Sequence, residues 1–214
     1  NLDSLMCNII SKTRYKIFYV SPKTIKYCIF PSKYADYNQW ALDKNHPHAG
    51  VNRAVFKEDP LGFIKINSSN WDHKAGILFS KLKEYKALKN HYTGKEKWRK
   101  SEFATRYINY LKMNNLKNDR NINNLKNYLS IREKQIDKLF NSILKKGIYP
   151  IDKNKKLFID NISLCLTTNE KLYFNNRGHH RLSIAKILGL KEIPIRITLA
   201  KSKKILEKFY LKNK

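Results

Sequence analysis

The feature that most constrains the fold is a regular alternation of helix-type and strand-type apolar patterns between Ile136 and Thr198. Ile136, Leu139, Phe140, Ile143 and Leu144 recur at the spacing of one helix face, and Gly147 follows where a helix commonly ends. Beyond it the pattern predicts strands over 148–151, 156–159, 163–167, 171–175 and 192–198, and a helix over 179–188 that ends at Gly189. This alternation predicts an α+β fold in which a small mixed sheet packs against helices.

The residues before this region predict a mostly helical N-terminal extension. Two short strands and a turn are expected within 15–30, an irregular segment over 31–62, and helices over 74–92 and 95–113. The segment 114–127 contains Asn-Asn-Leu-Lys-Asn twice, a polar composition typical of a linker. We therefore expect an extension over 1–126 and an α+β domain over 127–214, with a basic helix at 201–214.

A turn between a predicted strand and a predicted helix carries the clearest chemical pattern. Asn176, Arg177 and Gly178 precede a helix that begins with His179-His180-Arg181. The first N–H groups of a helix lack intrahelical partners and, together with the helix dipole, favour an anion. Asn176, Arg177, Gly178, His179, His180 and Arg181 are thus predicted to form an anion-binding turn. In the alternative interpretation Arg181 pairs with an acidic residue and the imidazoles contact nearby carbonyl groups.

The turn and its surroundings resemble the ParB N-terminal/sulfiredoxin-like superfamily. Gly178-His179-His180-Arg181-Leu182, then Ala185, Leu188-Gly189 and Ile193-Pro194-Ile195, is similar to that superfamily's signature, and 137–147 is similar to its opening helix. The resemblance implies that the turn binds ATP or CTP, with or without Mg²⁺. His179 replaces the cysteine of sulfiredoxins and the glutamate of ParB proteins, and Arg177 replaces a common aspartate, so binding is better supported than either known reaction.

The leading functional hypothesis is a nucleotide-phosphate-binding protein that acts as an ATP-dependent phosphotransferase or as an NTPase. His179 is a candidate phosphate ligand or acceptor, and the nearby acids Asp152, Asp160 and Glu170 are candidate general bases. The alternatives are a DNA- or RNA-binding protein, including a ParB-like nuclease, and an interaction protein whose anion site has lost its function.

Composition supports a polyanionic partner without identifying it. The formal net charge is +27, which suggests nucleotide or nucleic-acid binding, although lysine-, asparagine- and isoleucine-rich sequences also arise from A+T-rich coding. The three cysteines show no disulfide or zinc spacing, and His46 and His48 near Asp43 lack a matching pair, so we expect no metal site. A cytoplasmic protein without membrane segments is expected.

Overall fold

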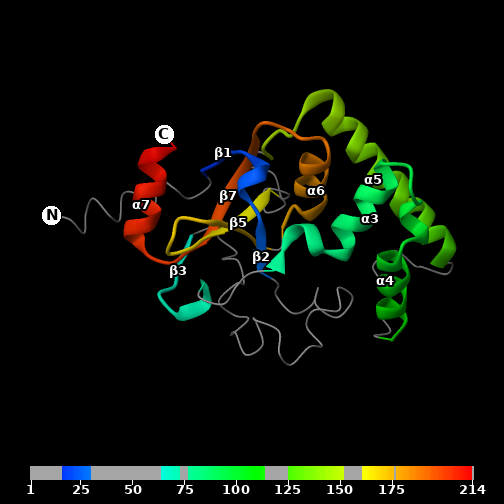
Figure 1. Cartoon of the computed structure of the whole chain (residues 1–214), viewed down its shortest axis with the longest axis horizontal. Coiled ribbons are helices and arrows are strands. Elements are labelled where there is room, and N and C mark those ends of the chain that lie inside the picture. Colours follow the sequence, from blue (N-terminus) through cyan, green and yellow to red (C-terminus); the bar gives the residue numbers. More distant parts are fainter. Residues whose placement is uncertain are drawn as a thin grey trace.

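The computed structural model describes residues 16–29, 64–72, 77–113, 125–151, 161–175 and 177–213. Figure 1 shows a sheet in the middle of the molecule with helices on both sides. The strands are β1 (Phe18–Val20), β2 (Tyr27–Ile29), β3 (Lys65–Ile66), β4 (Ile77–Leu78), β5 (Ile162–Leu166), β6 (Leu172–Asn175) and β7 (Ile193–Ala200).

These strands form one mixed sheet in the order β1-β7-β5-β6-β2-β4, and β3 pairs with the far end of β7. The β5–β7, β2–β6 and β3–β7 pairs are parallel, and the β1–β7, β5–β6 and β2–β4 pairs are antiparallel. The predicted α+β class with a mixed sheet is therefore confirmed.

The described residues also form five α-helices. They are α3 (Lys83–Tyr92), α4 (Glu102–Met113), α5 (Leu125–Lys146), α6 (His179–Ile187) and α7 (Lys203–Lys212), and short 3₁₀ turns occur at Pro22–Thr24, Asn70–Asp72, Phe79–Lys81 and Trp98–Lys100. In Figure 1, α7 lies at one end of the sheet, α3, α4 and α5 lie at the other, and α6 lies between the sheet and these three helices. None of the described helices is both long enough and apolar enough to cross a membrane.

The main hydrophobic core forms where α6 and α7 pack on the sheet. All eight residues of β7 are buried, as are all five of β5, and both strands have neighbours on each side in the sheet. Leu182 and Ala185 of α6 and Leu206 and Phe209 of α7 belong to this core. β5 contains Ser163 and β7 contains Arg196 and Thr198, so polar side chains of both strands are buried together with the apolar ones.

A second core joins α3, α4 and α5 without a strand. Trp98 and Leu88 are at most 2% exposed and pack with Phe103 and Ile136. Ser101 caps α4, since its hydroxyl accepts a hydrogen bond from the Ala104 N–H at 3.2 Å. This helical layer holds α3 against α6, which is the contact on which the candidate site depends.

Three expectations about the elements are corrected by the structure. The helix expected over 74–92 begins only at Lys83, because Ile77 and Leu78 pair with β2 as strand β4. The segment 148–151 forms no strand, whereas the strand expected over 156–159 lies outside the described residues. The strand expected to close the sheet, β7, is an inner strand with β1 and β5 beside it.

The expected boundary between residues 126 and 127 falls within helix α5, and one continuous sheet takes strands from both sides of it. β1 and β2 come from the N-terminal part, yet β1 pairs with β7 and β2 with β6. The N-terminal strands therefore complete the sheet of the C-terminal part.

Candidate functional site

The turn at Gly178 joins the end of β6 to the start of α6. The Arg177 N–H donates to the Asn175 carbonyl oxygen at 2.7 Å, and the Ser163 N–H of β5 donates to the Arg177 carbonyl oxygen at 3.2 Å. Gly178 has a φ of +77° and precedes the helix without giving it a side-chain cap. A Cβ at this position would lie 2.7 Å from the Cα of Ile162, so the turn requires glycine for both its conformation and its contact with β5.

The first two side chains of α6 contact a buried carboxylate. Nδ1 of His179 lies 3.3 Å from one oxygen of Glu84, and Nε2 of His180 lies 3.2 Å from the other. Glu84 belongs to α3 and is 8% exposed. The chain thus places its own anion beside the positive end of the α6 dipole.

Electrostatics favour an ionised Glu84 and a neutral His180. Burial by itself raises the pKa of Glu84, but the charge and hydrogen bond of His179 and the charges of His180 and Arg132 outweigh it and lower this pKa to about 2. Burial lowers the pKa of His180 to about 4 against the opposing attraction of Glu84. Arg132, on α5, acts on both groups, so three helices determine the protonation of this cluster.

Aromatic rings enclose the His179 imidazole. The ring stacks on Phe79 with centroids 5.2 Å apart and an interplanar angle of 23°, and it meets Phe174 edge-on at 5.6 Å. The Ser183 hydroxyl lies 3.5 Å from Nδ1 of His179. The Nε2 atom of His179 is buried and has no hydrogen-bond partner among the described residues. This enclosure restrains the imidazole and separates it from solvent.

Acidification is expected to destabilise the fold through His180. Its folded pKa of about 4 lies below the ordinary value of 6.5, so the unfolded chain binds this proton more tightly, and the stabilisation present above pH 6.5 is lost as the pH falls towards 4. Between pH 7 and pH 5 this group removes about 2 kcal/mol of the free energy of unfolding. Glu84, with a pKa of about 2, adds a further loss below pH 4.5.

Urea denaturation at pH 7 and pH 5 measures this effect. His180→Gln lacks the titrating group but retains a side-chain N–H near Glu84, so its stability should change less between the two pH values than that of the wild type. Equal pH dependence in both proteins would contradict the assignment.

The structure brings together only part of the predicted site. Arg177, Gly178, His179, His180 and Arg181 lie at the turn, and both arginines are half-buried. Glu170 lies before β6, at the opposite end of that strand from the turn, and the four strand residues alone span about 13 Å. It forms an ion pair with Lys208 of α7. Asn176, Asp152 and Asp160 lie outside the described residues.

Sequence reasoning missed Glu84, which contacts the turn from more than 90 residues upstream in the chain. A signal was present, because Glu84 precedes Leu88 by four residues and so shares the buried face of α3 with it. An acid on a buried helix face needs a cationic or hydrogen-bonding partner. In the part of the chain that is described, no group of three or more His, Cys, Asp or Glu side chains could hold a metal ion, and the segment with His46 and His48 lies outside it.

Comparison with family models, curated proteins and solved structures gave no match for this chain. The resemblance to the ParB/sulfiredoxin-like superfamily therefore rests on the turn motif and stays a prediction.

Proposed function

We propose that the turn formed by Arg177, Gly178 and the first residues of α6 binds the phosphate groups of a nucleotide such as ATP or CTP. The observation that carries this proposal is the uncapped start of α6 between two arginines. The helix dipole and the first N–H groups favour an anion there, and a guanidinium can donate two parallel hydrogen bonds to phosphate oxygens.

In this proposal the two histidines position the turn, and the arginines and backbone N–H groups contact phosphate. Both imidazoles already face Glu84, and His180, with a pKa of about 4, is neutral near pH 7. Their contacts tie the first turn of α6 to α3, so the donors of the turn are held in place before a ligand arrives. Such preorganisation reduces the entropy that binding would otherwise cost.

The geometry supports binding more strongly than phosphoryl transfer. A phosphate acceptor at His179 would use a ring nitrogen, yet Nδ1 faces Glu84 and Nε2 is buried. Glu170, the one candidate base among the described residues, lies at the far end of β6. A kinase or NTPase reaction would therefore need a base from outside the described residues, for which Asp152 and Asp160 are the candidates.

Arg181→Ala is expected to weaken nucleotide binding by about tenfold or more, because it removes a charge-assisted contact to phosphate. Calorimetric titration with ATP and CTP, with and without Mg²⁺, measures the loss. Arg106→Ala is a matched control, since it removes the same charge from α4, where Arg106 pairs with the exposed Glu102. Absence of binding to the wild type, or equal binding by both variants, would overturn the proposal.

A second candidate function is nucleic-acid binding through α7. Lys203, Lys204, Lys208 and Lys212 are all exposed on this helix, and the chain carries a net charge of +27. Binding of this type falls steeply as salt increases, because phosphate contacts release counterions. Duplex binding that depends on salt and is insensitive to Arg181→Ala would favour this candidate over the nucleotide site.

A further inference from the structure

A cavity of about 390 Å³ lies beside the C-terminal half of α6, away from the Gly178 turn. Its apolar wall is formed by Pro22, Ile25, Phe79 and Tyr85 from three separate segments of the chain. Ile25 and Phe79 are at most 1% exposed, so the wall is continuous with the main core. The volume falls in the range of pockets that hold small organic molecules.

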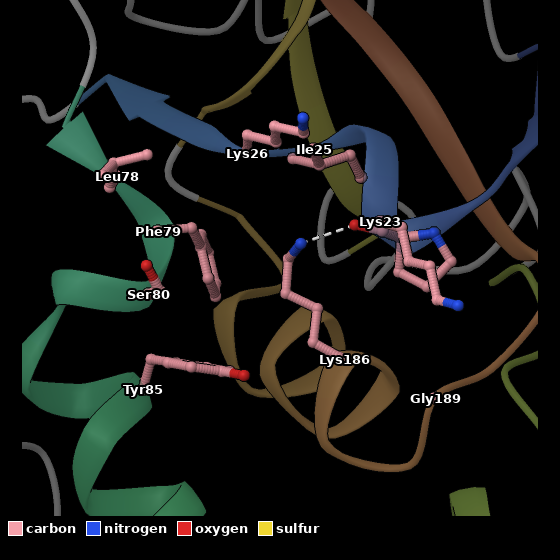
Figure 2. Close-up of a pocket in the computed structure, with 10 residues that line it drawn as sticks. Lys23, Ile25, Lys26, Leu78, Phe79, Ser80, Tyr85, Lys186 and Gly189 are labelled. Carbon is pink, nitrogen blue, oxygen red and sulfur yellow. Dashed lines mark hydrogen bonds between the residues drawn. The ribbon is translucent and has the colours of Figure 1, made fainter.

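A lysine from α6 enters this apolar space. Figure 2 shows the Lys186 side chain extending between Phe79 and Lys23, and its ammonium donates a hydrogen bond to the Pro22 carbonyl oxygen at 2.5 Å. The same Nζ lies 5.4 Å from the centroid of the Phe79 ring. An ammonium has three donors, so the bond to Pro22 leaves two others.

Lys186 is a partly buried cation that forms no ion pair with any carboxylate of the described residues. Burial lowers the pKa of Lys186 to about 8, and an electrostatic contribution from Cys28 acts in the opposite direction. Burying a charge without a counterion is unfavourable, and an anion in the cavity would offset that cost.

Two more lysines stand at the edge of the same cavity. Lys23 and Lys26 line it and are exposed to solvent, whereas Ile25 between them is buried. The cavity therefore combines an apolar wall with a cationic edge. A neutral apolar molecule would contact the wall but leave the lysines without a counterion, and an inorganic anion would pair with the lysines but leave the apolar wall uncovered.

We propose that this cavity binds a small organic anion whose ring or short hydrocarbon body lies against Phe79 and Ile25 and whose carboxylate or phosphate contacts the ammonium of Lys186. The Phe79 ring of this cavity also stacks on His179, but none of the residues from Arg177 to Arg181 lines the cavity. Lys186 follows His179 by seven residues, which is about 10 Å along the helix axis. The proposal therefore does not depend on nucleotide binding at the turn.

Titration of the purified full chain with benzoate, phenyl phosphate and the neutral benzamide tests the proposal. We expect saturable one-to-one binding of benzoate or phenyl phosphate with a Kd near or below about 1 mM, and about tenfold weaker binding of benzamide. The stronger of the two anions identifies the acidic group that the site prefers. Absence of saturable binding by both anions, or equal binding of benzamide, would overturn the proposal.

Lys186→Met should lower the affinity for the preferred anion by about tenfold, whereas Lys186→Arg should retain most of it. Lys134→Met is the matched control, because Lys134 is exposed on α5 and does not line the cavity. Arg181→Ala should leave benzoate binding unchanged, which separates this site from the turn. Equal affinity of the Met and Arg variants at position 186 would contradict the role of the ammonium.

A measurement on the wild type covers the case in which the Met variant does not fold. The preferred anion should protect Lys186 from acylation at pH 8 while leaving Lys134 reactive, as read by peptide mass spectrometry. Unchanged labelling of Lys186 at saturating anion would overturn the proposal.

Discussion

Gly178→Ala is expected to destabilise the protein by about 3 kcal/mol, since an L-residue in the left-handed region costs about 1 to 2 kcal/mol and a backbone clash adds a similar amount. The new Cβ would lie 2.7 Å from the Cα of Ile162, and backbone atoms of β5 cannot move aside as a flexible side chain could. Urea denaturation at pH 7 measures the change in the free energy of unfolding.

Gly94→Ala provides the matched control for this prediction. Gly94 has a φ of +74°, nearly that of Gly178, but a Cβ there would meet no atom within 4 Å. Its cost should therefore be limited to the conformational part, about 1 to 2 kcal/mol. If the two variants lose equal stability, the close contact between the turn and β5 is not the reason for glycine at position 178.

Glu84→Ala is expected to destabilise the protein by about 3 to 5 kcal/mol, the usual cost of removing one partner from a buried charged cluster. The substitution would leave the nitrogens of His179 and His180 without their carboxylate and would open a space between α3 and α6. Urea denaturation at pH 7 measures the change in the free energy of unfolding.

Glu102→Ala is the control for this second prediction. Glu102 also contacts two cations, Lys83 and Arg106, but its side chain is 61% exposed. Exposed ion pairs contribute at most about 1 kcal/mol, so the loss should be small. A Glu84→Ala variant as stable as Glu102→Ala would show that the buried cluster does not hold α3 against α6.

The region from β5 to α7 was predictable because its signals are local. The glycines at 178 and 189 mark the start and end of α6, and the observed helix ends one residue before the expected limit of 188. Ser202, whose hydroxyl accepts a hydrogen bond from the Ile205 N–H, begins α7 within the basic segment. In each case the residue type alone specifies the backbone conformation.

The N-terminal part was less predictable because its structure depends on distant partners. Ile77 and Leu78 fit the apolar spacing of a helix, but hydrogen bonding to β2 makes them a strand. The two short strands expected within 15–30 are β1 and β2, and they pair with β7 and β6, which come from the other end of the chain. Nothing within a few residues of these segments encodes such pairings.

The candidate site likewise has one part that was predictable from local sequence and one part that depends on distant partners. The turn and its arginines were found from the motif, whereas Glu84 and Lys186 gain their roles only when α3 and the Pro22 segment pack against α6. Glu84 neutralises part of the positive charge that the motif offers to an external anion. A list of cationic residues at a helix start therefore overstates the charge available to a ligand.

The position of β7 in the chain also affects how the protein can form during synthesis. β1, β3 and β5 all pair with β7, which is the last of the described strands to leave the ribosome. At about 5 to 20 residues per second, β1 waits roughly 10 to 35 seconds for its partner. Until then the earlier strands lack their central neighbour, and unpaired strand edges with exposed apolar faces favour aggregation of the incomplete chain.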